Sequence, residues 1–209
     1  MIVAFRVRAM GRTIAAMTTS TNPITTTALP LAPGRWELDT NHSTVGFTIR
    51  HLGVSKVRGR FANFTAEVIV GPDLESTSVT AEIDLASIDT GNPDRDAHVR
   101  AADMLDVAKR PNMLFRSTRI TPMRDRYELV GNLTIGGVTQ PLTLDVDFGG
   151  LETFPGGPRH AGFEATGQLR RSDFGLDLSL PPGVGGVLLA DVVKIELDIQ
   201  LIEPDLNAA

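Results

Sequence analysis

Short runs in which apolar and polar residues alternate are the feature that most limits how this 209-residue chain can fold. Successive side chains of a strand point to opposite faces, so a period of two indicates a strand with one buried face. The runs occupy residues 44–50, 61–70, 79–85, 113–115, 127–135, 142–148, 163–169 and 193–201. Because so many one-sided strands need a shared core, we predict an all-β protein.

The number of strands favours closure of the sheet. We expect about eight strands, or nine if Trp36 and Leu38 form another. A barrel removes the unpaired edges of an open sheet, and an eight-stranded barrel has room for one small ligand. We therefore predict a single eight-stranded antiparallel barrel over residues 34–205, with a β-sandwich as the structural alternative.

Two local features interrupt the strand pattern. Residues 94–105 follow Pro93, begin with acidic residues and carry an apolar stripe, which predicts a single helix packed across the barrel. The apolar phase changes between Phe61 and Phe64, which predicts a bulge that bends one strand.

The first 33 residues have no strand periodicity and are rich in Thr and Ser, so we expect a disordered tail. Met10 and Met17 are alternative start sites. The apolar stretch is broken at Arg12 before it reaches the length of a standard secretory signal, so we expect a cytoplasmic protein. No run approaches the roughly 18 apolar residues of a spanning helix, and we expect no membrane span.

Composition and motif spacing exclude several functions. A net charge of −5 disfavours binding to nucleic acid, and the absence of Cys excludes disulfides and thiolate chemistry. No Ser lies in a Gly-x-Ser-x-Gly elbow, and the glycines of 182–187 lack the Lys of a phosphate-binding loop. The six Asp residues of 84–106 lack EF-hand spacing and are expected to be solvated surface charges. We predict no catalytic residue, metal or cofactor.

The polar candidates lie around the first long run. His42 and His51 are nine positions apart and should point to opposite faces, which disfavours a shared metal. Each is either a structural residue or a contact for a ligand headgroup at the barrel mouth. The nearby cations either hold a phosphate there or form a solvated edge that blunts strand pairing. The rim candidates are His42, His51, Arg50, Arg58 and Arg60, with Lys56 in the same basic cluster.

Several blocks of sequence between residues 34 and 203 carry a family likeness. They are residues 36–39 (Trp-Glu-Leu-Asp), 42–47 (His-Ser-Thr-Val-Gly-Phe), 50–53, 57–61, 87–91, 95–100, 109–111, 115–118, 131–139 and 171–175. In this order the blocks resemble the YceI-like family. Residues 104–107 depart from it where the family favours an aromatic pair, and residues 69–72 depart where it often has an acid before the turn.

The resemblance implies a lipocalin-like barrel that binds a polyisoprenoid lipid, such as an isoprenoid quinone or a prenyl phosphate, commonly as a homodimer. Many members are secreted to the periplasm. Burial of an isoprenoid chain yields on the order of 25 cal/mol per Å² without polar contacts, so the site is expected to be a lining. The expected lining residues are Val45, Phe47, Ile49, Phe61, Phe64, Val79, Ile83, Phe115, Leu133, Leu144, Phe163, Phe174, Ile195 and Leu197.

Several alternatives stay open at this point. The same apolar side chains could fill a solid core, because small barrels often pack their interiors. The favoured hypothesis is non-catalytic lipid binding or transport. One alternative is an enzyme that uses His42, Ser43 or His51 as an acid or base, and another is broad sequestration of apolar molecules in a stress response.

Overall fold

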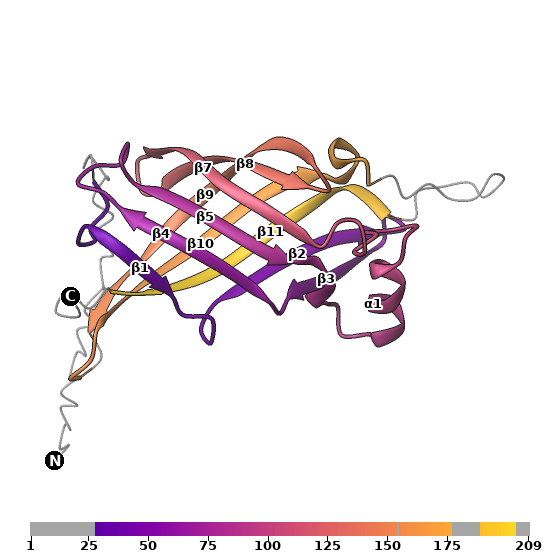
Figure 1. Ribbon diagram of the computed structural model, residues 1–209, viewed down its shortest axis with the longest axis horizontal. Coiled ribbons are helices and arrows are strands. Elements are labelled where there is room, and N and C mark those ends of the chain that lie inside the picture. The colour runs from indigo at the N-terminus through magenta and orange to yellow at the C-terminus, as the bar shows by residue number, and fades with distance from the viewer. Residues whose placement is uncertain (1–27, 154, 177–188, 204–209) are drawn as a thin grey trace, which may run out of the picture.

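The computed structural model describes residues 28–153, 155–176 and 189–203 (Figure 1). Most of the predicted tail, residues 1–27, lies outside the described residues. The strands are Gly34–Leu38 (β1), Thr44–His51 (β2), Ser55–Phe61 (β3), Phe64–Val70 (β4), Ser78–Asp84 (β5), Ile88–Asp89 (β6), Asn112–Pro122 (β7), Tyr127–Ile135 (β8), Val138–Thr153 (β9), Arg159–Arg170 (β10) and Leu189–Ile202 (β11). The helical elements are α1 (Pro93–Arg100) and the 3-10 turns η1 (Leu85–Ser87) and η2 (Arg171–Phe174).

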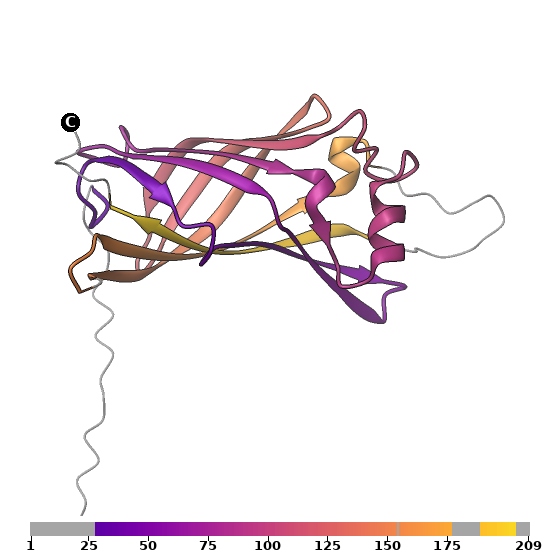
Figure 2. The same ribbon diagram turned by 60° about the horizontal axis from the view of Figure 1, so that its bottom comes forward.

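Eight of the described strands form a closed antiparallel ring in the order β1, β4, β5, β7, β8, β9, β10 and β11. The ring closes because the end of β11 pairs with β1, with Leu38 opposite Leu201. The earlier part of β11 pairs with β2, which continues through β3 to β6. The strands cross an elongated barrel at a tilt, and α1 lies at one end (Figures 1 and 2). The predicted eight-stranded barrel is therefore confirmed.

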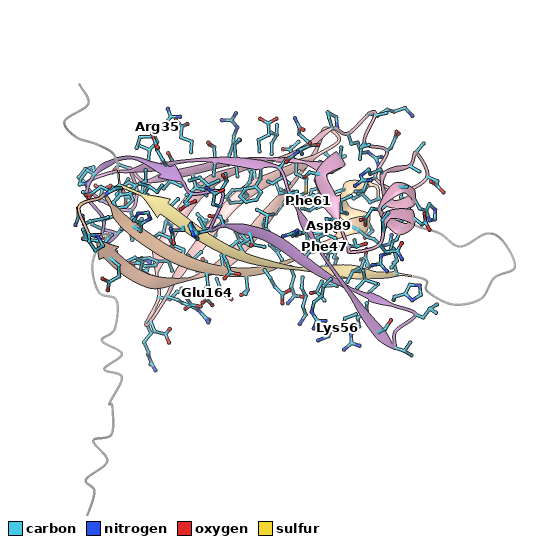
Figure 3. All side chains as sticks on the ribbon, turned by 90° about the horizontal axis from the view of Figure 1, so that it is seen from below. Arg35, Phe47, Lys56, Phe61, Asp89 and Glu164 are labelled. Carbon is cyan, nitrogen blue, oxygen red and sulfur yellow. The ribbon has the colours of Figure 1, made fainter. Side chains whose placement is uncertain are left out.

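The alternation of the sequence becomes an inside and an outside of this barrel. Figure 3 shows Phe47 and Phe61 within the barrel, whereas Glu164 projects outward. Phe47 and Phe61 form a tilted ring pair with centroids 5.6 Å apart. One-sided burial along each strand thus produces the enclosed apolar space.

The helix is shorter than the predicted 94–105. It begins where Asn92 caps the backbone N–H of Arg95 at 3.0 Å and Pro93 occupies the first turn, and it ends at Arg100. Beyond Arg100 the backbone N–H groups of Met104 and Asp106 both donate to the carbonyl of Ala101, so the chain turns instead of continuing the helix. Among the described residues, no helix is long and apolar enough to cross a bilayer.

The phase change between Phe61 and Phe64 is a break between two strands, so the predicted bulge is wrong. Strand β3 ends at Phe61 and β4 begins at Phe64. Between them Ala62 N–H donates to the carbonyl of Ser87 at 3.0 Å, and Asn63 N–H donates to the hydroxyl of the same residue. The η1 turn therefore accepts the backbone hydrogen bonds at this break. The chain can leave the pairing of β3 and begin the pairing of β4.

A second, smaller core lies beneath β1. Trp36 is 1% exposed, and its indole N–H donates to the carbonyl of Ala32 at 2.8 Å. Leu31 packs in the same cluster, so the end of the predicted disordered tail, residues 28–33, is in fact packed against the barrel. The buried members of this cluster are Leu31, Trp36, Val68, Val70, Ala161 and Leu201.

Candidate functional site

An internal cavity of about 730 Å³ lies inside the barrel. Its lining extends along β11 from Leu189 to Leu201. At roughly 3.3 Å per residue and a strand tilt near 40°, this stretch corresponds to about 30 Å along the barrel axis. A volume of this size spread over such a length forms a narrow channel, which suits a chain-shaped ligand better than a compact one.

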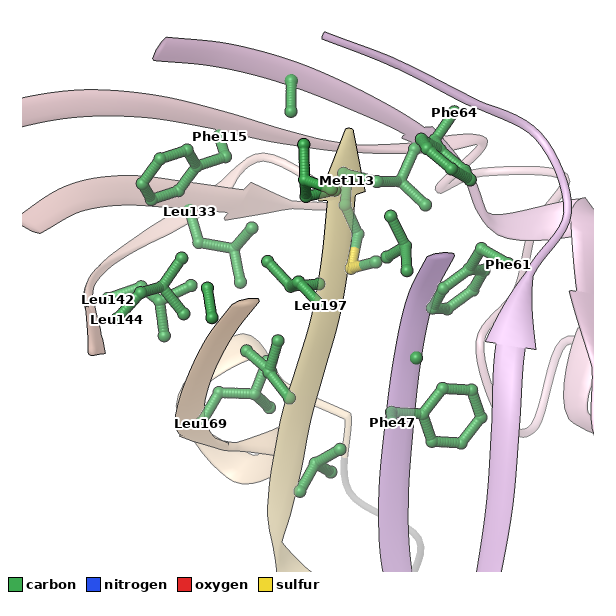
Figure 4. A pocket seen from close by; sticks show the side chains of 18 of the residues that line it. Phe47, Phe61, Phe64, Met113, Phe115, Leu133, Leu142, Leu144, Leu169 and Leu197 are labelled. Carbon is green, nitrogen blue, oxygen red and sulfur yellow. The ribbon is translucent and has the colours of Figure 1, made fainter. Parts of the chain in front are cut away.

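The wall of the channel is almost entirely aliphatic and aromatic. Figure 4 shows Phe47, Phe61, Phe115, Leu144 and Leu197 around the open space. No Asp or Glu is among the described residues that line it. Such a wall offers dispersion contacts and exclusion of water along most of its length, without fixed polar recognition.

Glycines in the wall allow two aromatic rings to lie against the backbone. A Cβ atom on Gly59 would come within 3.0 Å of the ring of Phe47, and one on Gly131 would come within 3.0 Å of the ring of Phe115. Each ring therefore occupies the space that a neighbouring side chain would otherwise fill. This packing leaves room along the axis.

Thirteen of the fourteen residues predicted as lining do line the channel. Their contact with a ligand stays a prediction. They are Val45, Phe47, Ile49, Phe61, Phe64, Val79, Ile83, Phe115, Leu133, Leu144, Phe163, Ile195 and Leu197.

Phe174 is the exception, and its placement in the channel lining was wrong. It belongs to η2, which packs against β9, β10 and β11, and it is 3% exposed. Its ring borders a small separate hollow shared with Pro141 and Gln168. The 3-10 turn after β10 ends the alternation of the strand, so the period of two no longer predicts the direction of Phe174.

Polar groups gather where the channel reaches α1. They come from the β2–β3 hairpin, the segment between β6 and α1, α1 itself, and η2. These residues are His51, Ser55, Lys56, Thr90, Arg95, His98 and Arg171. Arg95 is tied to Thr90 by two hydrogen bonds of 2.7 Å, and Arg171 donates to the carbonyls of Leu176, Leu189 and Ala190. This end of the channel is therefore basic, and two of its guanidinium groups also hold the surrounding backbone.

Of the five predicted rim residues, His51 reaches the channel lining. Arg50, Arg58 and Arg60 are exposed and do not line the channel, because they alternate with the inward residues of β2 and β3. Arg60 instead pairs with Asp89 at 3.2 Å. Val57 and Phe61 point inward and alternate with the arginines of β3. This alternation could have predicted that the arginines lie on the outer face. Arg95, His98 and Arg171 were missed because they lie outside strands.

His42 lies in a hydrogen-bonded network away from the channel lining, so the structure does not bring it to the rim. Its Nδ1 is 2.8 Å from Oδ2 of the buried Asp39, which also accepts from the side chain of Gln200 at 3.0 Å. Asp39 Oδ1 accepts from Asn41 N–H. The hydroxyl of Ser43 accepts from Gln200 N–H. Among the described residues these contacts do not link Ser43 to His42, and they attach the β1–β2 turn to β11.

This network makes stability depend on pH. Burial raises the pKa of Asp39, but hydrogen bonds from His42 and Asn41 outweigh it, and the net pKa lies below the ordinary 3.8. A depressed pKa stabilises the fold above pH 3.8, and that stabilisation is lost as the pH falls through the folded value. We expect Asp39→Asn to lose about 1–2 kcal/mol of unfolding free energy at pH 7 and to lose part of the wild-type decline below pH 5.

Urea unfolding at pH 7, 5 and 3.5 measures this effect. Asp198→Asn, on an exposed position of β11, is the control and should retain the wild-type slope. Identical pH slopes for Asp39→Asn and the wild type would show that the Asp39 network does not contribute.

Two of the acidic residues expected on the surface are buried. Asp96 is 6% exposed and accepts from the N–H and the hydroxyl of Thr90, at 3.0 and 2.5 Å. Asp106 is 9% exposed and pairs with Lys109 at 3.1 Å. Both fix the segment that carries α1. Within the described part of the chain, no three His, Asp or Glu side chains converge to hold a metal ion.

Comparisons with known proteins agree with this architecture. A family model, the YceI-like domain, matches residues 36–201. Protein YceI of Salmonella arizonae is 34% identical over 190 residues, which are 90% of this chain and 97% of that protein. The crystal structure of the Campylobacter jejuni YceI protein has a TM-score of 0.65 and 27% identity, and the match covers 75% of this chain and 90% of that one.

A more distant solved structure is a polyisoprenoid-binding domain from Saccharophagus degradans that is implicated in plant cell wall breakdown. It has a TM-score of 0.61 over 83% of this chain and all of that one, at 13% identity, so this likeness shows the fold alone. The family model, in contrast, matches far more than half of the sequence, from the first barrel strand to the last. The chain therefore belongs to the YceI-like family.

Proposed function

We propose that this protein binds a polyisoprenoid lipid inside its channel and carries it without altering it chemically. The observation that carries the proposal is the long, narrow and apolar channel, which is open enough for a chain and whose described lining residues include no acid. Each 100 Å² of buried isoprenoid surface contributes about 2.5 kcal/mol, so a long chain can bind through its length alone. The polyisoprenoid-binding domain of Saccharophagus degradans, which shares the fold, supports the same ligand class.

The positions of the polar residues support a non-catalytic role. Of the three residues considered for an acid or base, His42 and Ser43 do not line the channel, and His51 lies at its α1 end. An acid or base must come within hydrogen-bond reach of the atom that reacts. Away from the α1 end, the wall offers a lipid mainly hydrocarbon surface, with hydroxyl groups at Thr65, Thr77 and Tyr127. The basic α1 end suits the polar head of a quinone or a prenyl phosphate.

Mass spectrometry of organic extracts from the purified protein tests the proposal. We expect a co-purified lipid with an isoprenoid fragmentation pattern. After delipidation, the protein should take up solanesol and an isoprenoid quinone from detergent micelles in preference to a straight-chain alcohol of similar length. The absence of both a co-purified lipid and uptake would overturn the proposal, and equal uptake of unrelated apolar compounds would favour broad sequestration.

A further inference from the structure

Two large apolar side chains are exposed at the tip of the β2–β3 hairpin. The strands pair up to His51 and Ser55, and Leu52, Gly53 and Val54 connect them. Leu52 is 56% exposed and Val54 is 83% exposed, the two highest values among the exposed large hydrophobic residues of the described chain. These side chains add little to the packing of the barrel, so the fold itself does not explain them.

The backbone makes Leu52 more unusual. Its φ is 50°, in the left-handed region, followed by Gly53 at 72°. Gly, Asn and Asp adopt this conformation readily, whereas a residue with a bulky side chain is strained there. The turn itself would be better served by Asn at position 52. A strained, exposed Leu is therefore best explained by a contact outside this chain.

Cations surround the apolar tip. Residues 50–60 contain four basic side chains and no acidic one, in a chain with a net charge of −5. Arg50, Lys56 and Arg58 are exposed and, among the described residues, form no ion pair. In the strand register Arg58 lies opposite Thr48, and Thr48 lies opposite the exposed Lys194 of β11. The carboxylate of Glu196 accepts from the hydroxyl of Thr48 at 2.9 Å, so the uncompensated positive charge is concentrated on the hairpin itself.

The tip stands beside the basic end of the channel. His51, Ser55 and Lys56, at the base of the turn, line the channel together with Arg95 and His98 near α1. Figures 2 and 3 show the hairpin projecting at this end, where Figure 3 labels Lys56. Whatever contacts the tip is therefore next to one end of the internal space.

We propose that the β2–β3 hairpin docks on an anionic membrane surface. Leu52 and Val54 enter the boundary between headgroups and acyl chains, and Arg50, Lys56 and Arg58 face the lipid phosphates. An apolar tip with a collar of cations matches both layers of such a surface, which a purely electrostatic patch does not. The inference goes beyond the proposed lipid ligand, because docking on a membrane does not depend on which lipid the channel holds.

Co-sedimentation of the full chain with vesicles tests the docking. We expect binding to vesicles of mixed phosphatidylglycerol and phosphatidylcholine, weaker binding to phosphatidylcholine alone, and a decrease in added salt. The double substitution Leu52→Asn with Val54→Thr should lower the partition coefficient at least about tenfold while it relieves the strained turn. Arg50→Gln with Arg58→Gln, two exposed cations outside the channel lining, should lower it by about fivefold for each cation.

Control substitutions at the distant β7–β8 turn complete the design. Met123 is 39% exposed, and Arg124 is exposed in the same turn, so Met123→Gln with Arg124→Gln removes a similar side-chain pair. This variant should bind vesicles like the wild type. Equal vesicle binding by the hairpin variants and the wild type, or no binding by any of them, would overturn the proposal. The proposal would also be overturned if the wild type were a dimer that bound no vesicles and the Leu52→Asn, Val54→Thr variant were a monomer.

Uptake of solanesol from detergent micelles separates this inference from the proposed function. Micelles present the lipid without an anionic surface, so the hairpin variants should load as the wild type does. Normal loading together with absent vesicle docking would reject the docking alone. Normal docking together with absent loading would reject the lipid cargo alone.

Discussion

Replacement of Ala165 by Phe is expected to abolish lipid loading while leaving the barrel folded. Ala165 lies on β10 between Val146 and Leu197 of the neighbouring strands, and all three side chains line the channel. A ring at this position would extend into the narrow bore and divide it. A chain held on one side of the ring loses much of its buried surface, and each 1.4 kcal/mol lost weakens binding tenfold. We expect at least a hundredfold weaker uptake.

The matched control is Thr166→Phe, which places the same ring on the exposed outer face of the same strand. It should load lipid like the wild type, as measured by lipid per protein in mass spectrometry and by titration with solanesol. Thermal unfolding of the Ala165→Phe variant should stay close to that of the wild type, because the ring enters existing space. Unchanged loading by a folded Ala165→Phe variant would show that the lipid does not bind in the channel.

Replacement of Trp36 by Ala is expected to lower the free energy of unfolding more than any of the other substitutions proposed for this protein. Trp36 is 1% exposed in the core beneath β1, and its indole donates a hydrogen bond to Ala32. Removal of a fully buried aromatic side chain typically destabilises by about 3–5 kcal/mol. The loss of unfolding free energy should be near the upper end of this range, because β1 pairs with both β4 and β11 and closes the ring.

Thermal and urea unfolding measure this loss, and we expect the melting temperature to fall by roughly 10 °C or more. Glu37→Ala is the control, since Glu37 is the next residue of the strand and is exposed. Its effect should stay within about 0.5 kcal/mol. A similar small effect of Trp36→Ala would mean that closure by β1 contributes little to the fold.

The sequence predicted the parts of this protein that depend on local alternation. Inward positions such as Phe47 and Leu133 follow from the period of two, because a strand carries its side-chain direction with it. Whether those side chains fill the interior or leave it hollow depends on how strands distant in sequence pack together. The period of two therefore does not predict whether the interior is filled or hollow.

Apart from the arginines of β2 and β3, whose outward direction the strand period could have indicated, the errors lie where the chain leaves the strands. Phe174 lies in η2 outside the channel lining, and Asp96 is buried where Thr90 supplies its hydrogen bonds. Arg95 and Arg171 reach the channel from α1 and η2, which no strand period describes. His42 failed as a rim residue because Asp39, three positions earlier, holds its ring. Each outcome depends on a tertiary partner that the sequence order does not reveal.

The aromatic rings of Phe47 and Phe115 pack over Gly59 and Gly131 of the neighbouring strands. The hydrogen bonds between strands hold the backbone in place, whereas the absence of a methyl group at Gly59 and Gly131 leaves the space that the rings of Phe47 and Phe115 occupy. We expect Gly59→Ala to displace the ring of Phe47, because the added Cβ atom would come within 3.0 Å of it. At Gly131 the added Cβ atom would also lie 2.6 Å from the backbone carbonyl oxygen of Arg116, so the same replacement would disturb the pairing of β7 with β8. For the proposed lipid ligand, a change of one codon at position 59 is therefore expected to alter the width available beside Phe47 while the strand pairing of the barrel stays the same.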